Sequence, residues 1–409
     1  MRLAGVGLAC VSILLLLGCA SAPEITAPTW SAEIQPLMAQ HCMGCHQDGG
    51  LSFALTDYAQ VMAVGPAILD AVQTGRMPPF LAEPESCRPL QGSRRLNAAQ
   101  VERFDAWMSA DFPYGLELEP TPIPPVETLS QANEVLRTPA FSPDVSQGDE
   151  WRCFVLEGDP ELRFLQAYSV TPQNREVVHH VSLFSPVDSE SAEGARVLDQ
   201  GQGYTCFGDT LVPSLLVAIW SPGQDLYRYP EGTGVRLEPG LPLIAQVHYS
   251  GALDPGVSEE TEIALQTAVQ VDWPVWPLFF LHDSFELAPG QSEVHSEREM
   301  SLGQAITQMG AQDQLPQESF RIFGAGVHMH LMGRSVSARV GEQCLVDVPE
   351  WDYGWHDLYF YKESLELSRQ DTVSIECAWD TSSATGPVVW GDSLEDEMCG
   401  VLLLASPLD

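Results

Sequence analysis

Positively charged side chains are scarce in this chain of 409 residues, which has 19 lysines and arginines against 56 aspartates and glutamates. A formal net charge of −37 would repel a phosphate backbone, so binding to nucleic acid is excluded. A basic protein or a neutral small molecule is a compatible partner. Long helices are also disfavoured, because 33 glycines and 31 prolines predict frequent turns.

Long apolar runs are missing after the N-terminus, and the run Leu211–Trp220 is too short to span a membrane. The N-terminal apolar run Leu3–Leu17 leads into Gly18-Cys19, the pattern of a lipoprotein signal peptide over residues 1–18. We therefore expect Cys19 to be lipidated and the protein to be anchored on the periplasmic side of a bacterial membrane. Ala20 favours the outer membrane. An ordinary signal peptide with a chance cysteine is the alternative.

A Cys-x-x-Cys-His motif occupies residues 42–46, within a segment of short expected helices. Cys42 and Cys45 can form thioethers to a haem, and His46 can then ligate the iron. A redox disulfide would need a strand–helix context, and half a zinc site would need a second Cys-x-x-Cys; neither is found in the sequence. The segment 31–115 resembles a class I-like cytochrome c with one covalent haem.

The resemblance to cytochrome c implies that a methionine in a later loop is the second iron ligand. Met77 lies in the Pro-rich sequence Gly75-Arg76-Met77-Pro78-Pro79 and is the predicted ligand, with Met43, Met62 and Met108 as the alternatives. A helix is also expected to begin at Asn97, where Gln100 completes a capping pair. Three short helices form a small core, which a haem would fill.

A proline-rich stretch from 116 to 139 shows little periodicity and is expected to be a stiff, exposed linker. Beyond it, short runs rich in Val, Phe, Leu and Tyr recur between turn residues. This pattern predicts β-sandwiches, and the length suits two of them, over 140–273 and 274–409.

Histidine placement suggests metal binding in these sandwiches. His179 and His180 are adjacent, His248 follows alone, and His328 and His330 are two apart. An i, i+2 pair on a strand points both imidazoles to one face, whereas adjacent residues need a bulge or a strand end to share one metal. Each pair alone is equally well explained by solvated or core imidazoles. Four further histidines show no partner spacing: His41, His282, His295 and His356.

The order of these motifs, followed by Asp396-Glu397-Met398-Cys399, resembles the copper type II, ascorbate-dependent monooxygenases. That family includes peptidylglycine α-hydroxylating and dopamine β-monooxygenases, and the resemblance runs from about residue 150 to the C-terminus. It implies two copper ions, held by two ligand sets: His179, His180 and His248; and His328, His330 and Met398. Two imidazoles and a thioether favour Cu(I) and leave a position open for dioxygen. The expected fold class is mainly β, with two jelly-roll β-sandwich domains preceded by a small all-α cytochrome c-like domain.

Six cysteines remain once Cys10 is removed with the signal peptide and the lipid and haem cysteines are assigned, in a compartment that permits disulfides. The family resemblance implies two bonds, Cys153–Cys206 and Cys377–Cys399, the second of them beside Met398. Cys87 and Cys344 match nothing in the family, so they either pair or stay free.

Three positions depart from the peptide-amidating branch of the family, which holds a substrate carboxylate with an arginine, an asparagine and a tyrosine. Gly326, Gly400 and Leu402 stand at these positions and cannot bind a carboxylate, so a glycine-extended peptide is not the expected substrate.

The expected function is insertion of one oxygen atom of O2 into a C–H bond of a small or neutral organic substrate. His328, His330 and Met398 would form the catalytic oxygen site, and the other copper would relay the second electron. Electrons would arrive through the haem from ascorbate or from a basic redox protein. The alternative is a non-catalytic electron carrier or a copper-binding lipoprotein.

Overall fold

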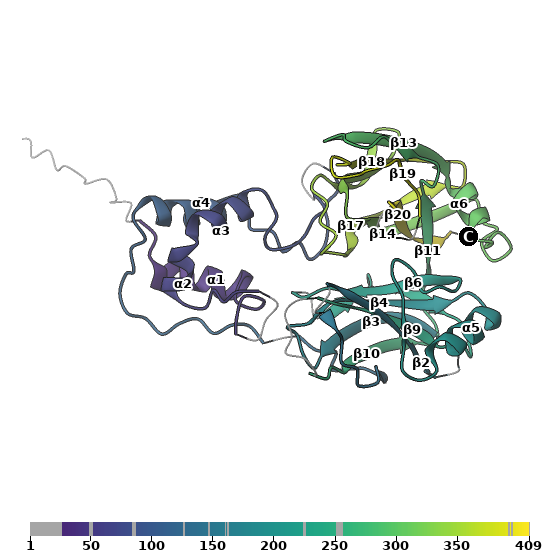
Figure 1. Cartoon of the computed structure of the whole chain (residues 1–409), viewed down its shortest axis with the longest axis horizontal. Coiled ribbons are helices and arrows are strands. Elements are labelled where there is room, and N and C mark those ends of the chain that lie inside the picture. Colours follow the sequence, from purple (N-terminus) through teal and green to yellow (C-terminus); the bar gives the residue numbers. More distant parts are fainter. Residues whose placement is uncertain are drawn as a thin grey trace, which may run out of the picture.

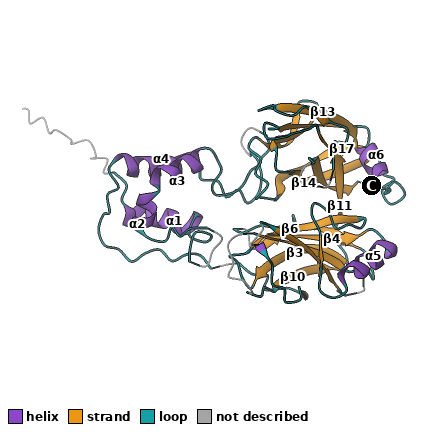
Figure 2. Cartoon of the chain, viewed as in Figure 1, coloured by secondary structure: helices purple, strands orange, loops and turns teal. Residues whose placement is uncertain are grey.

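The computed structural model describes residues 27–408, with gaps at 49–51, 84–86, 126, 146–147, 160, 162, 224–225, 251–256, 392 and 394–395. The expected signal peptide and Cys19 lie outside the described residues. Across the described part of the chain, no helix is long and apolar enough to cross a membrane. The chain is mainly β, with a small helical segment at its N-terminal side (Figures 1 and 2).

The described residues of the helical segment form one short π-helix and four α-helices: η1 (Trp30–Ile34), α1 (Gln35–His41), α2 (Tyr58–Ala63), α3 (Gly65–Gln73) and α4 (Ala98–Ser109). The predicted capping pair is confirmed, because the Asn97 side chain accepts from the Gln100 amide and Gln100 bonds back. Phe104 and Trp107 on α4 are buried in a core that also contains Met43. The cytochrome-like character of this segment stays a prediction.

The first sandwich contains, in its described part, ten strands and one helix: β1 (Glu134–Arg137), β2 (Glu150–Leu156), β3 (Arg163–Pro172), β4 (Val178–Pro186), α5 (Ser189–Asp199), β5 (Tyr204–Thr205), β6 (Ser214–Trp220), β7 (Leu226–Arg228), β8 (Thr233–Leu237), β9 (Leu243–Tyr249) and β10 (Thr261–Ala268). One sheet has the order β5-β2-β9-β4-β6, and strands β1, β10, β3 and β8 face it. Buried apolar side chains from both layers fill the core between them.

In the second sandwich the structure describes ten strands and one helix: β11 (Trp273–Leu281), β12 (Glu286–Leu287), β13 (Val294–Ser301), α6 (Leu302–Gln308), β14 (Ser319–Met329), β15 (Gly333–Val340), β16 (Gln343–Val348), β17 (Leu358–Ser368), β18 (Thr372–Trp379), β19 (Val388–Val389) and β20 (Cys399–Pro407). Its outer sheet has the order β13-β18-β15-β16. Its inner layer, β11-β20-β14-β17, continues the sheet of the first sandwich, because β8 and β11 pair in parallel. The two sandwiches therefore share one sheet.

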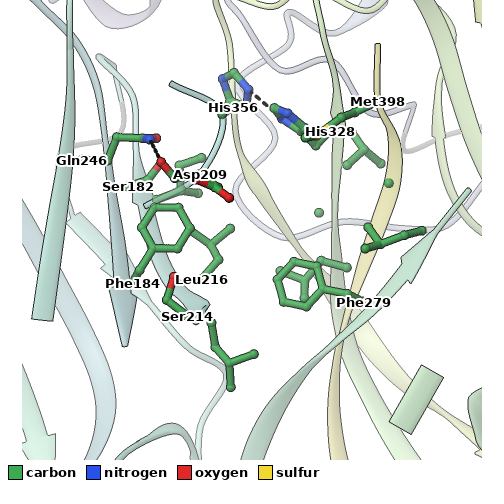
Figure 3. A pocket seen from close by; sticks show the side chains of 18 of the residues that line it. Ser182, Phe184, Asp209, Ser214, Leu216, Gln246, Phe279, His328, His356 and Met398 are labelled. Carbon is green, nitrogen blue, oxygen red and sulfur yellow. Dashed lines mark hydrogen bonds between the residues drawn. The ribbon is translucent and has the colours of Figure 1, made fainter. Parts of the chain in front are cut away.

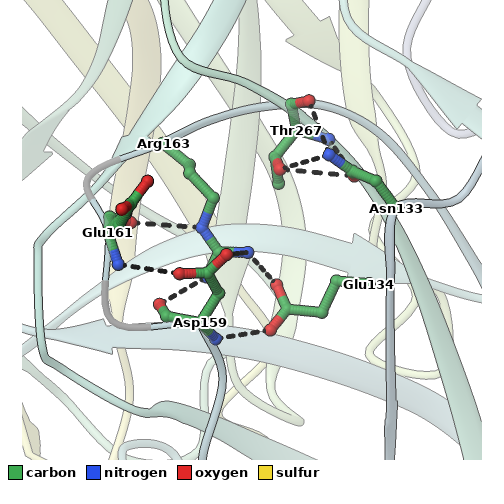
Figure 4. A network of polar contacts seen from close by, with 6 residues as sticks. All are labelled: Asn133, Glu134, Asp159, Glu161, Arg163 and Thr267. Atoms are coloured by element: carbon green, nitrogen blue, oxygen red, sulfur yellow. Dashed lines mark hydrogen bonds and ion pairs between the residues drawn. The ribbon is translucent and has the colours of Figure 1, made fainter.

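The expected linker over 116–139 ends earlier than predicted, because residues 134–137 form β1 and pair with β10. Polar contacts fix the end of the linker to the first sandwich (Figure 4). The Asn133 amide donates to Thr267 O at 3.0 Å, and Glu134 forms an ion pair with Arg163 in which both side chains are mostly buried. The end of the linker is thus part of the first sandwich.

A second connection joins the helical segment to the second sandwich. We call residues 79–83 and 87–95, between α3 and α4, the strap. Backbone hydrogen bonds from Gln91 N to Phe360 O (2.8 Å) and from Lys362 N to Pro89 O (2.9 Å) run along the edge strand β17. Buried strap residues also enter the core of the second sandwich: Phe80, Leu81, Ala82 and Leu90. The helical segment is therefore held by packing as well as by the linker.

Candidate metal centres

The adjacent histidines lie on β4, and the structure contains the bulge that they require. The register between β4 and β9 shifts between Val178 and His180, and His180 pairs directly with His248 on β9. The ligand nitrogens of His179, His180 and His248 lie within 4.8 Å of one another. The three imidazoles therefore converge, as the binding of one metal ion requires.

The geometry of this first set fits a bound metal ion. The Nδ1 atoms of His180 and His248 are 3.2 Å apart, close to the separation of two nitrogens that each lie about 2 Å from one tetrahedral ion. His248 Nε2 lies 3.1 Å from an Asp149 carboxylate oxygen, and such a partner is what orients a metal-binding imidazole. Trp151 stacks on the His248 ring at 4.2 Å, which further limits its rotation.

The second pair of histidines lies at the end of β14, where His328 is its penultimate residue and His330 follows it. Their rings are 5.4 Å apart. His330 Nδ1 lies 3.1 Å from Asp396 O, so donation to this carbonyl presents Nε2 as the ligand nitrogen. The β14–β20 register pairs Met329 with Cys399, which places Met398 beside His330. Met398 and His328 line the same cavity (Figure 3).

Glu397 is a structural residue of this second set that the motif alone does not assign. Its fully buried carboxylate accepts hydrogen bonds from four groups: the backbone N–H of His330 (2.9 Å), Met332 (2.5 Å) and Met398 (3.2 Å), and the Trp379 indole N–H (3.1 Å). Burial raises the pKa of Glu397 to about 7. The carboxylate thereby ties the His-x-His turn to the methionine.

Burial keeps the clustered imidazoles neutral, which is the form that binds a metal. It lowers the pKa of His328 to about 3 and that of His248 to about 4. Burial also lowers the pKa of His179 and His180, and for His180 the neighbouring imidazoles add to the effect. A neutral imidazole has one lone pair available for a cation.

His356 is a site residue that sequence spacing missed. It precedes β17 and is 7% exposed, and its ring lies 4.8 Å from that of His180 and 5.4 Å from that of His328. It therefore stands between the two histidine sets. No local pattern indicates this position, since the two imidazoles beside it, His180 and His328, are more than 25 residues away in the chain.

A cavity of about 700 Å³ opens between the two sandwiches beside the histidines. Its wall is mostly apolar, with Phe184 and Leu216 from the first sandwich and Phe279 from the second (Figure 3). Gly326, Gly400 and Leu402, the three positions that depart from the peptide-amidating branch, also line it. None of the described residues that line the cavity is a lysine or an arginine.

The Cys-x-x-Cys-His motif follows α1. Cys42 and Cys45 form no disulfide, and His46 Nδ1 lies 3.0 Å from Phe53 O. Donation from Nδ1 to a carbonyl leaves Nε2 as the nitrogen for an iron, so these residues fit a covalent haem. Met77 is half-buried in the turn after α3, and its role as second ligand stays a prediction.

The structure contains both disulfides that the family resemblance implies, Cys153–Cys206 and Cys377–Cys399. It also pairs the two cysteines that sequence reasoning left open. Cys87 in the strap is bonded to Cys344 on β16, across 257 residues. The strap is therefore attached covalently to the second sandwich.

Comparison with known proteins finds a similarity to the same family over part of the chain. Residues 285–404 match the copper type II ascorbate-dependent monooxygenase C-terminal domain. MOXD1 homolog 2 of Drosophila melanogaster is 24% identical over 294 residues, which cover 61% of this chain and 37% of that protein. Putative DBH-like monooxygenase protein 2 of Homo sapiens is 26% identical over 254 residues, covering 57% and 48%. Tyramine beta-hydroxylase of Caenorhabditis briggsae is 23% identical over 252 residues, covering 56% and 40%.

The chain spans less than half the length of these curated relatives. The similarities support the family that the histidine and Glu-Met-Cys motifs indicate. Among solved structures, the infectious bursal disease virus VP2 subviral particle covers 69% of this chain and 73% of its own, at 12% identity and a TM-score of 0.15. A likeness that weak carries no argument.

Proposed function

We propose that this protein is a copper-dependent monooxygenase that inserts one oxygen atom of O2 into a C–H bond of a small organic substrate. The observation that carries the proposal is the convergence of His179, His180 and His248, because His180 lines the same cavity as His328 and Met398. The reaction consumes O2, two electrons and two protons, and yields a hydroxylated product and water. Copper supplies the one-electron steps and the activation of dioxygen when bound.

The two ligand sets would divide this work. His179, His180 and His248 give an all-imidazole site, held by the Asp149 carboxylate and by Trp151. A second set, comprising His328, His330 and Met398, adds a thioether that favours the reduced ion. Glu397 holds the backbone of this second set in place, so the three donors would change little between oxidation states.

The cavity would select a neutral, largely apolar substrate. Apolar side chains from both sandwiches form most of its wall, and no described cation lines it that could pair with a carboxylate. Exclusion of water by this wall would protect the reaction from side products. Gly326 adds no side chain at the position where the peptide-amidating branch has its arginine.

We further propose that a covalent haem on Cys42 and Cys45, ligated by His46, supplies electrons to the copper sites. Its support is the place of the motif: a Cβ added to Gly223, in the loop after β6, would lie 3.2 Å from Cys45 Sγ. Ser221, two residues earlier, donates a hydrogen bond to His356 O at 2.8 Å. Cys45 therefore approaches the loop after β6, and Ser221 of that loop bonds to His356, whose imidazole stands between the two histidine sets.

Metal analysis tests the copper assignment without knowledge of the substrate. We expect two copper ions and one haem per chain, with Cu–S scattering in the X-ray absorption spectrum of the Cu(I) protein. Replacing His179 and His180 with alanine should remove one copper and leave the Cu–S signal, because the thioether belongs to the other set. A single copper in the unaltered protein would contradict the two-site assignment.

A further inference from the structure

A buried ion pair joins the strap to the wall of the cavity between the two sandwiches. Arg94 donates to the Asp357 carboxylate at 2.7 Å, with the two side chains 17% and 6% exposed. Tyr227 of the first sandwich donates to the other carboxylate oxygen at 2.9 Å. Because this carboxylate is desolvated, its charge-assisted bonds are stronger than surface bonds and costly to break. Asp357 is thus fixed by the helical segment and by the first sandwich together.

His356 precedes Asp357 in the chain, and contacts with other residues hold it in place as well. Its carbonyl accepts the hydrogen bond from Ser221, and its Nε2 lies 3.3 Å from His328 Nδ1 (Figure 3). Its Nδ1 is buried and has no hydrogen-bond partner among the described residues. The ring also packs against that of His180. One imidazole thereby contacts a ligand from each set.

Contact with His328 Nδ1 determines which nitrogen His328 offers to copper. His328 Nε2 is buried and has no hydrogen-bond partner among the described residues, so it is the nitrogen available for a metal. A metal-binding imidazole is oriented by the partner of its other ring nitrogen, and that partner is usually a carboxylate, a carbonyl or water. Here the partner is a second imidazole.

We propose that His356 is a positioning residue for both copper sites, and that Arg94 of the strap holds it in place through Asp357. This inference rests on the proposed copper function. It makes the helical segment part of the support of the metal centre, in addition to any role as an electron donor. A disturbance at Arg94 should therefore reach the copper ligands through two neighbouring residues, Asp357 and His356.

The test compares full-length, copper-loaded proteins by the Cu(II) EPR spectrum and by Cu(I) affinity in competition with bicinchoninate. His356→Phe should change the EPR hyperfine pattern and weaken Cu(I) binding by about 10–100-fold, the usual effect of losing such a partner. His356→Gln keeps a hydrogen-bonding group and should recover part of the affinity. Arg94→Met should shift the same signals in the same direction, and by less.

Two matched controls separate positioning from general destabilisation. His282→Phe removes another buried imidazole, bonded to Ser296, and Arg163→Met breaks another mostly buried ion pair, with Glu134. Both should keep the EPR spectrum and Cu(I) affinity of the unaltered protein. If Arg94→Met does not fold, Tyr227→Phe removes the second bond to Asp357 and should produce the same shift.

The outcomes distinguish the inference from the function on which it rests. Unaltered EPR spectra and Cu(I) affinity in His356→Phe, with or without a lower melting temperature, would overturn the positioning role. Unaltered EPR spectra and Cu(I) affinity in both Arg94→Met and Tyr227→Phe would overturn the claim that the strap holds His356 through Asp357. Failure of the unaltered protein to bind copper would instead contradict the proposed function.

Discussion

Replacing Met398 with alanine is expected to abolish substrate-dependent oxygen consumption. Removing the thioether takes away the soft ligand that favours Cu(I) at the set containing His328 and His330. Loss of a partner outside the ligand shell already costs about 10–100-fold in metal affinity or activity, so loss of the ligand should cost about 100-fold or more. The measurement is oxygen uptake with excess ascorbate and ethylbenzene as an apolar probe, together with copper content.

The Met398→Ala protein should retain the copper held by His179, His180 and His248, because the two sets share no ligand. Met332→Ala is the matched control, since the backbone N–H of Met332 bonds to the same Glu397 carboxylate as that of Met398, but Met332 is outside the proposed ligand set. It should keep both coppers and the oxygen uptake. Unchanged uptake in Met398→Ala, with loss in Met332→Ala or Met329→Ala, would show that another methionine is the ligand.

The double replacement of Cys42 and Cys45 with alanine should remove all haem that survives denaturation of the protein. No thioether can then form, so the pyridine haemochrome spectrum of the denatured protein should vanish. Copper content should stay at two per chain, because the strap is bonded to the second sandwich by residues outside the motif. Cys42→Ala alone should keep one thioether and therefore covalent haem.

Haem that remains attached after both replacements would refute its covalent attachment through this motif. Loss of copper along with the haem would mean that the helical segment folds only around its haem. In that case Arg94 would also lose its place beside Asp357. Any copper that the protein still binds should then give an EPR spectrum like that of Arg94→Met.

Much of the fold could be predicted because its signals are local. The frequent short apolar runs predicted the strands, and the predicted boundary at 273/274 falls at the start of β11. The parallel pairing of β8 with β11 could not be predicted, because it joins strands of different sandwiches and no local sequence pattern near either strand indicates it. The Cys87–Cys344 bond was left open for the same reason, since it links residues far apart in the chain.

The candidate site was predictable where its ligands have regular spacing. Adjacent histidines on a strand require a bulge to converge, and the register shift at His180 provides it. His356 and Arg94 could not be found in this way. His356 has no nearby partner in sequence, and the Arg94–Asp357 pair depends on how the strap packs against the second sandwich.

The most direct test of copper-dependent monooxygenation is isotope incorporation by the fully reduced protein. We would mix it with ¹⁸O₂ and apolar probes (ethylbenzene and indane) and follow products by mass spectrometry. The proposed function predicts that a probe accelerates oxygen consumption and acquires one ¹⁸O atom, and that chelation of copper stops both. Reduction of all the oxygen to peroxide or water, at a rate that no probe changes, would contradict it and favour a non-catalytic haem and copper protein.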